Sequence, residues 1–277
     1  MTSFGERLRS RIDSRGPLCV GIDPSTALLR AWGLDDSPSG LEKFARSAVE
    51  AVADLAPVVK PQSAFFERFG SRGVAVLESV IADARARGAL VIMDAKRGDI
   101  GSTTAAYAQA YLDPAGPLAA DAVTVSPYLG FGSLRPMVDT ALAHGAGLFV
   151  LARTSNPEAG EVQLATGPDG RTVAATVMDH VAGLNRGAAP LGSIGVVLGA
   201  TLDDPGYPVE RLGGPILAPG VGAQGATFAD AARLFAGARR DVLPSVSRAV
   251  LAEGPDPARL RAAVSRLGAE AREHLSA

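Results

Sequence analysis

The sequence of 277 residues contains very little cysteine or histidine. Cys19 is its single cysteine, and it lies in the apolar run Leu18–Ile22, where we expect a buried structural thiol. One cysteine excludes a disulfide within the chain and a metal site built from cysteines. None of the histidines has a second histidine or cysteine at metal-ligand spacing; they are His144, His180 and His274. We therefore expect a site without metal.

Net charge and long apolar segments are also scarce. Lys and Arg total 27 against 29 Asp and Glu, and the net charge of -2 gives no field that would hold nucleic acid or an anionic membrane. No apolar segment reaches the roughly 18 residues of a membrane span. Met1–Arg15 lacks the apolar core of a signal peptide. We expect a cytoplasmic protein without nucleic-acid or membrane partners.

The sequence does contain a series of short apolar runs rich in β-branched residues. Continuous rather than alternating hydrophobicity is typical of parallel strands that are buried on both faces. Eight such runs are present: Leu18–Pro24, Pro57–Pro61, Ala89–Lys96, Ala122–Tyr128, Gly147–Thr154, Ile194–Thr201, Pro215–Gly222 and Asp241–Arg248. Most are separated by alanine-rich stretches with helical periodicity, such as Leu41–Leu55 and Phe228–Ala236.

A strand followed by a helix, repeated in this way, predicts an α/β fold, the (β/α)8 TIM barrel, as a single domain over residues 1–277. A doubly wound sheet is the alternative. One interval, Ser155–Ser193, is long and contains the turn sequence Gly167-Pro168-Asp169-Gly170 before the helical stretch Val173–Leu184. We expect a hairpin-like excursion after the fifth strand, to which the sequence assigns no role.

Charged residues are concentrated where the predicted strands end. The third strand runs directly into Asp94, Lys96 and Asp99. Lys60 closes the second strand and Asp23 the first. In a barrel these ends converge on the active-site face, and in a regular strand Asp94 and Lys96 would share one face, where carboxylates keep the lysine protonated. A purely stabilising ion-pair network at the barrel rim is the competing interpretation, but three neighbouring charged strand ends favour catalysis.

The string Asp94-Ala95-Lys96-Arg97-Gly98-Asp99, preceded by Lys60, resembles the hallmark of the orotidine 5'-phosphate decarboxylase family. Its extension to Thr103 resembles the bacterial branch with larger subunits, type 2. The resemblance implies a cofactor-free homodimer in which Lys60, Asp94 and Lys96 of one chain alternate with Asp99 of the partner chain. It also implies substrate contacts by the following residues: Asp23 and Lys60 at the ribose, Ser155 at the pyrimidine, and Ile100 and Thr103 across the interface.

A glycine-rich segment follows the seventh predicted strand, and an arginine closes the eighth. TIM barrels commonly bind phosphate with these two loops. Glycines such as Gly222 and Gly225 let backbone N–H groups approach phosphate oxygens, and Arg248 adds charge-assisted hydrogen bonds. We assign Gln224 to the phosphate, with the pyrimidine as a second option. Simple turns are the alternative explanation for the glycines and for the Ser-Asn-Pro sequence at Ser155.

These residues and the resemblance together predict decarboxylation of orotidine 5'-phosphate to UMP and CO2, the last step of de novo UMP biosynthesis. Lys96 would stabilise the ring carbanion as a preorganised charge and then protonate it. The nearest alternative is a magnesium-dependent sugar-phosphate lyase of the same barrel superfamily, although a cation at Lys60 would repel the metal. A non-catalytic phosphate-binding barrel is the other alternative. Ser126 and Tyr128 receive no role.

Overall fold

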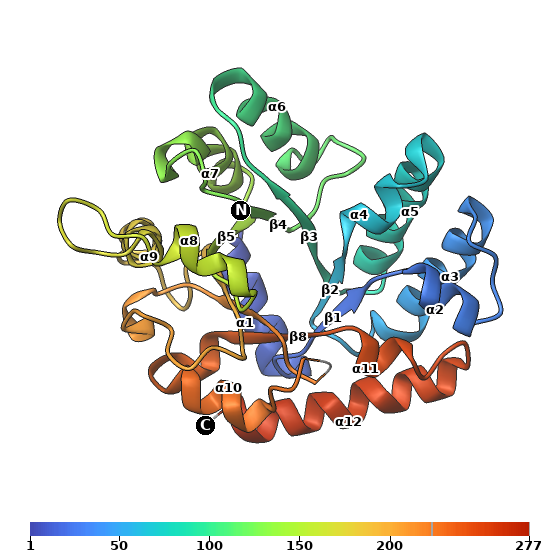
Figure 1. Cartoon of the computed structure of the whole chain (residues 1–277). Coiled ribbons are helices and arrows are strands. Elements are labelled where there is room, and N and C mark those ends of the chain that lie inside the picture. Colours follow the sequence, from blue (N-terminus) through green and yellow to red (C-terminus); the bar gives the residue numbers. More distant parts are fainter. Residues whose placement is uncertain (223, 277) are drawn as a thin grey trace.

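The computed structural model describes residues 1–222 and 224–276, and its centre is a closed barrel of parallel strands (Figure 1). The strands follow one another around the barrel in chain order, and β1 pairs with β8 through Cys19 opposite Ser245. Closure excludes the doubly wound sheet, so the prediction of a (β/α)8 barrel is confirmed. The strands are β1 Cys19–Ile22, β2 Val58–Pro61, β3 Leu90–Arg97, β4 Ala122–Val125, β5 Gly147–Arg153, β6 Ile194–Leu198, β7 Ile216–Pro219 and β8 Val242–Val246.

Each predicted apolar run coincides with one of these strands, but most strands end earlier than predicted. β4 ends at Val125, two residues before Pro127, which has no N–H group to continue a ladder. β8 ends at Val246, because Ser247 leaves the extended conformation with φ −133° and ψ −72°. Ser126 therefore occupies the first loop position after β4, whereas Arg248 begins α11 after the single residue Ser247.

Helices surround the barrel (Figure 1). α3 illustrates how the sequence specifies one of them: the Ser37 side chain accepts a hydrogen bond from the Gly40 N–H group, Pro38 occupies the first turn, and Leu41 and Phe44 lie on the buried face. In the described ranges, no helix is both long and apolar enough to cross a membrane. The helices are α1 Phe4–Arg15, α2 Thr26–Ala31, α3 Pro38–Val52, α4 Ser63–Glu67, α5 Gly70–Ala86, α6 Gly101–Leu112, α7 Arg135–Ala143, α8 Gly160–Gln163, α9 Val173–Leu184, α10 Phe228–Leu234, α11 Arg248–Leu251 and α12 Pro257–Leu275.

The first helix, α1, closes one end of the barrel. Its apolar residues Phe4 and Leu8 are fully buried in one cluster with side chains from inside the barrel, including Phe149. The rings of Phe4 and Phe149 meet edge to face, with centroids 6.0 Å apart. A side chain at Gly147 would meet Phe4, because a Cβ atom there would lie 2.3 Å from the ring. This apolar plug leaves the opposite end, where the strands terminate, for a cavity.

Cys19 belongs to the same inner cluster. Its side chain is fully buried, and burial raises the pKa of its thiol to about 12. A thiol with this pKa is neutral at physiological pH and is a poor nucleophile. The prediction of a buried structural cysteine is therefore confirmed.

The long interval after β5 contains α8 and a small antiparallel pairing before α9. Thr166 pairs with Thr172, and the Gly167 N–H group donates to the Arg171 carbonyl group at 2.9 Å. The turn sequence between these residues thus forms the expected hairpin. α9 spans Val173–Leu184, as predicted, and leads back to β6.

Candidate active site

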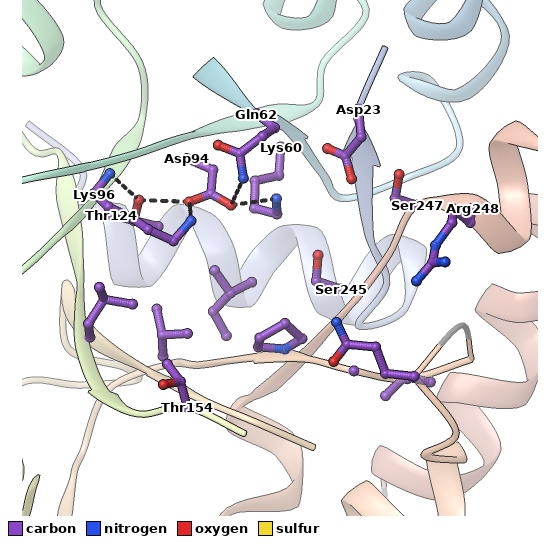
Figure 2. A pocket seen from close by; sticks show the side chains of 17 residues that line it. Asp23, Lys60, Gln62, Asp94, Lys96, Thr124, Thr154, Ser245, Ser247 and Arg248 are labelled. Carbon is purple, nitrogen blue, oxygen red and sulfur yellow. Dashed lines mark hydrogen bonds and ion pairs between the residues drawn. The ribbon is translucent and has the colours of Figure 1, made fainter. Parts of the chain in front are cut away.

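A cavity of about 300 Å³ opens at the C-terminal ends of the strands (Figure 2). Its polar side carries charged groups, and its apolar side is formed by residues of β5, β6 and β7 such as Leu151, Val197 and Leu217. This combination suits a ligand that has a flat ring and charged substituents. Six of the predicted site residues line the cavity: Asp23, Lys60, Asp94, Lys96, Gln224 and Arg248.

Asp94 lies between two ammonium groups. Lys60 Nζ is 2.8 Å from Asp94 Oδ2, and Lys96 Nζ is 2.5 Å from Asp94 Oδ1 (Figure 2). Lys60 and Asp94 are only 6% and 7% exposed, whereas the Lys96 side chain is 45% exposed. The structure therefore brings three of the four predicted charges together, and Lys96 is the cation of this trio that remains accessible from the cavity.

Asp94 and Lys60 keep their charges at neutral pH. Burial alone would raise the pKa of the Asp94 carboxyl, but the charges of Lys60 and Lys96 and their hydrogen bonds outweigh burial and hold this pKa well below its usual range. Burial alone would lower the pKa of Lys60, but the negative charges of Asp94 and Asp23 raise it overall. Fixed charges of opposite sign thus alternate along the polar wall.

β3 is irregular at Lys96. This residue has a φ of 48°, in the left-handed region that residues other than glycine rarely adopt, and the register between β3 and β4 shifts between Met93 and Arg97. The regular geometry assumed for this strand is therefore interrupted at Lys96. The Lys96 and Asp94 side chains nevertheless meet, as predicted.

Two residues that were not predicted complete the surroundings of Asp94. The Thr124 hydroxyl group donates to Asp94 Oδ1 at 3.0 Å, and Thr124 Oγ1 accepts a hydrogen bond from the Lys96 N–H group at 3.0 Å. Gln62 Nε2 donates to Asp94 Oδ2 at 3.1 Å. Gln62 follows Lys60 by two residues, and this spacing could have predicted that the two side chains lie on the same face. A threonine within an apolar run gives no such signal.

Asp23 and Ser247 line the cavity from the ends of β1 and β8. Asp23 Oδ1 and Ser247 Oγ are buried and have no hydrogen-bond partner among the residues described. Buried polar atoms are normally satisfied within a folded protein. These two atoms are therefore suited to the polar groups of a ligand. Ser247 was not predicted, although its neighbour Arg248 was.

The residues predicted at a subunit interface do not line the cavity. Asp99 Oδ1 accepts a hydrogen bond from the Ile100 N–H group at 2.8 Å, immediately before α6. Ile100 and Thr103 are exposed at the beginning of that helix. Within one chain, Asp99 does not join the trio around Asp94. Its contribution to the site of a second subunit stays a prediction.

The glycine-rich segment after β7 uses its backbone differently from the expectation. The Gly222 N–H group donates to the Ala226 carbonyl group at 2.8 Å, and the Gly225 N–H group donates to the Gly222 carbonyl group at 2.9 Å. Both amides are therefore engaged within the loop. Positive φ angles of 78° and 98° explain why glycine occupies these positions. The side chains of Gln224 and Arg248 are the parts of the predicted phosphate site that reach the cavity.

At the end of β5, Thr154 lines the cavity, whereas the predicted Ser155 is exposed. Thr154 is anchored by Gln163 of α8: its N–H group donates to Gln163 Oε1 at 2.8 Å, and Gln163 Nε2 donates to Thr154 Oγ1 at 2.9 Å. The excursion after β5 thus contacts the cavity wall through Gln163. The role of Ser155 stays a prediction.

The second cation of the β3 string, Arg97, bonds away from the trio. Its guanidinium group contacts Glu67 and the Tyr111 hydroxyl group.

In residues 1–222 and 224–276, no three His, Cys, Asp or Glu side chains gather as metal ligands. Ammonium groups occupy the positions beside Asp94 that a cation would otherwise take.

Comparisons with known proteins agree with this geometry. Residues 16–263 match the model of the orotidine 5'-phosphate decarboxylase / HUMPS family. A curated relative from Streptomyces coelicolor, named orotidine 5'-phosphate decarboxylase, is 61% identical over 277 residues and 100% of both chains. One of the same name from Corynebacterium glutamicum is 52% identical over 271 residues and 97% of each chain.

Solved structures agree as well. A Streptomyces avermitilis crystal structure matches with a TM-score of 0.98 and 60% identity, covering 100% of this chain and 97% of the other. The Leishmania donovani OMP decarboxylase matches with a TM-score of 0.77 and 31% identity over 100% of both chains. The chain therefore belongs to the orotidine 5'-phosphate decarboxylase / HUMPS family.

Proposed function

We propose that the cavity at the barrel mouth decarboxylates orotidine 5'-phosphate to UMP and CO2, the last step of de novo UMP biosynthesis. The observation that carries this proposal is the buried Asp94 carboxylate held between Lys60 and Lys96. A relative named for this activity is 61% identical over the full chain. The magnesium-dependent lyase alternative is disfavoured because the Lys60 ammonium group beside Asp94 would repel the metal.

Lys96 supplies the chemistry of the reaction. The bond between the pyrimidine ring and the carboxylate breaks, CO2 leaves, and the electron pair stays on the ring carbon. No adjacent carbonyl group delocalises this pair, so a fixed positive charge must stabilise it. The Lys96 ammonium group provides that charge in a preorganised position and then transfers a proton to the carbon. Lys96 afterwards regains its proton from water.

Asp94 and Lys60 position this ammonium group. Asp94 Oδ1 holds Lys96 Nζ, and Asp94 Oδ2 is bound by Lys60 and Gln62. The carboxylate therefore has a fixed orientation before the substrate binds. Preorganised charges need little rearrangement during the reaction. Stabilisation by such charges is usually the largest single contribution to catalysis.

Different residues along the cavity bind the ribose, the phosphate and the pyrimidine ring of the substrate. Asp23 and Lys60 hold the ribose hydroxyl groups, and within residues 1–222 and 224–276 Asp23 Oδ1 has no partner and can accept a hydrogen bond. Arg248 and Gln224 hold the phosphate, together with the loop that contains Gly222 and Gly225. Ser155 recognises the pyrimidine ring. Binding energy from the ribose and phosphate offsets the cost of placing a carboxylate in the desolvated site.

The active enzyme is a homodimer whose sites are shared between subunits. Asp99, Ile100 and Thr103 reach into the partner's site. Exposed apolar side chains on the loops after the neighbouring strands β3 and β4 support a second copy on this face, since Ile100 is 61%, Tyr128 76% and Leu129 55% exposed. Contact there would bring Asp99 towards the partner's Lys96 and complete the alternating charges.

The chain also forms one domain and works in the cytoplasm. The one-domain organisation is supported by a closed barrel whose strands extend from Cys19 to Val246. The cytoplasmic location is supported by the family, whose pyrimidine-pathway enzymes typically work there.

The purified protein is tested by incubation with orotidine 5'-phosphate. Loss of the substrate's ultraviolet absorbance, with UMP formed in equal amount, is the expected result. The rate should be the same with and without EDTA, because the cation acting on the substrate is a lysine. Activity that EDTA removes and Mg²⁺ restores would favour the lyase. Phosphate-ester binding without turnover would favour a non-catalytic barrel.

A further inference from the structure

The Ser247 hydroxyl group is a polar group of the cavity to which the proposed mechanism gives no role. Ser247 lies between β8 and α11 and lines the cavity, yet its buried Oγ atom has no hydrogen-bond partner among the described residues. It stands at the N-cap position of α11 but makes no capping hydrogen bond. Serine at such a position usually bonds the helix backbone. Here the hydroxyl group remains unused by the fold.

The local packing places this hydroxyl group beside Asp23. A Cβ atom at Gly21 would lie 2.9 Å from Ser247 Cβ and 3.3 Å from Asp23 Oδ2. Only glycine on β1 therefore leaves room for both side chains at the adjoining ends of β1 and β8. Asp23 Oδ1 is also buried and has no hydrogen-bond partner in the part of the chain that the structure describes. Two unsatisfied polar atoms thus lie close together at the same edge of the cavity.

The chemistry of the two atoms differs. The Asp23 carboxylate is an acceptor and requires a ligand donor, such as a ribose hydroxyl group. The Ser247 hydroxyl group can donate to a ligand acceptor. Figure 2 shows Ser247 between Asp23 and Arg248. A phosphate bound by Arg248 would lie near Ser247, because the two residues are adjacent in the chain and both line the cavity.

We propose that Ser247 is a substrate-binding residue that donates a hydrogen bond to the 5'-phosphate and so adds to selection for phosphorylated nucleotides. This inference rests on the proposed function and deepens it. In the ligand-free enzyme the unpartnered hydroxyl group reduces stability, because a buried polar group without a hydrogen bond is unfavourable. Phosphate binding satisfies it.

Steady-state kinetics of Ser247→Ala with two substrates test the proposal. For orotidine 5'-phosphate, kcat/KM should fall roughly tenfold to a hundredfold, the range for one hydrogen bond to a charged group. For orotidine, which lacks the phosphate, kcat/KM should stay within about twofold. Arg248→Ala is the positive control. It should also lower kcat/KM for orotidine 5'-phosphate and leave kcat/KM for orotidine nearly unchanged.

Thermal unfolding separates binding from a structural role. Ser247→Ala should not lower the Tm of the ligand-free enzyme, but it should reduce the rise in Tm that saturating UMP produces in the wild type. Thr104→Val is a matched control, since Thr104 Oγ1 is also buried without a partner but does not line the cavity. It should leave the response to UMP unchanged.

Three outcomes would overturn the inference: equal losses with both substrates, a lower Tm without ligand, or unchanged kinetics with orotidine 5'-phosphate. Turnover by the wild type distinguishes a failure of this inference from a failure of the proposed function. If the wild type failed to decarboxylate orotidine 5'-phosphate, the function itself would be wrong. If the wild type and the Arg248→Ala variant behaved as expected while Ser247→Ala matched the wild type, only the role of Ser247 would be wrong.

Discussion

Asp94 is the residue on which the site is built. It accepts hydrogen bonds from Lys60, Lys96, Gln62 and Thr124, and it is almost fully buried. A buried carboxylate with this many donors stays charged and fixed. Substitution of one member of a buried ion pair leaves the other charge unpaired. Such a substitution lowers the free energy of unfolding by about 3–5 kcal/mol.

The pH dependence of stability follows from the lowered pKa of Asp94. A carboxyl whose pKa is lower in the folded state stabilises the fold above its usual pKa of 3.8, and this contribution is lost as pH falls. The difference in free energy of unfolding between the wild type and Asp94→Asn should therefore be constant from about pH 5 to 8 and shrink below about pH 4. Urea unfolding at several pH values measures it. A difference that grew at low pH would mean that the Asp94 pKa is raised.

In the proposed mechanism Lys96 carries the catalytic charge, so Lys96→Ala should lower kcat by more than the roughly 10²–10³-fold loss seen for one preorganised donor. UMP affinity should change much less, because the charge acts mainly near the transition state. Single-turnover kinetics and UMP titration measure the two effects. Retention of more than about a hundredth of wild-type activity would show that Lys96 is not both stabiliser and proton donor.

At the scale of elements, the junction of β3 and β4 positions Lys96, the proposed catalytic lysine. Lys96 has a left-handed backbone conformation, which costs of order 1–3 kcal/mol and persists only where the surroundings enforce it. Thr124 supplies that enforcement, because one hydroxyl group binds both the Lys96 N–H group and Asp94. Thr124 and the Lys96 ammonium group both bind Asp94 Oδ1.

Thr124→Val should therefore lower kcat by about tenfold to a hundredfold, since small displacements of a catalytic group have effects of this size. Thr124→Ser, which keeps the hydroxyl group, should retain activity within a few-fold of wild type. KM should change little in both variants. Similar losses in the serine and valine variants would point to a packing role for the threonine methyl group instead.

The sequence was sufficient to predict the strands and the charges that follow them. Buried parallel strands have continuous apolar runs, and Lys60, Asp94 and Lys96 stand out where those runs end. It was not sufficient for Thr124 and Ser247. Their importance depends on contacts across neighbouring strands and on whether a hydroxyl group is satisfied, and neither property has a signature along the chain.

At the scale of the whole molecule, the two ends of the barrel have different tasks. α1 fills one end with apolar side chains, and the other end holds the charged cavity. Asp99 and the exposed Ile100, Tyr128 and Leu129 lie on loops after β3 and β4 at that second end. This arrangement is the basis for the proposal that two copies of the chain complete each other's sites.

A heterodimer of Lys96→Ala and Asp99→Ala subunits tests this central claim most directly. Each variant homodimer should be nearly inactive. In the heterodimer, one site carries both changes, whereas the other combines an unchanged Lys96 with an unchanged Asp99. Co-expression with two affinity tags allows purification of the heterodimer, and by the two-fold symmetry of a dimer its activity should be about half that of wild type. A purified heterodimer as inactive as its parents would contradict the shared site and place Asp99 in its own chain's reaction.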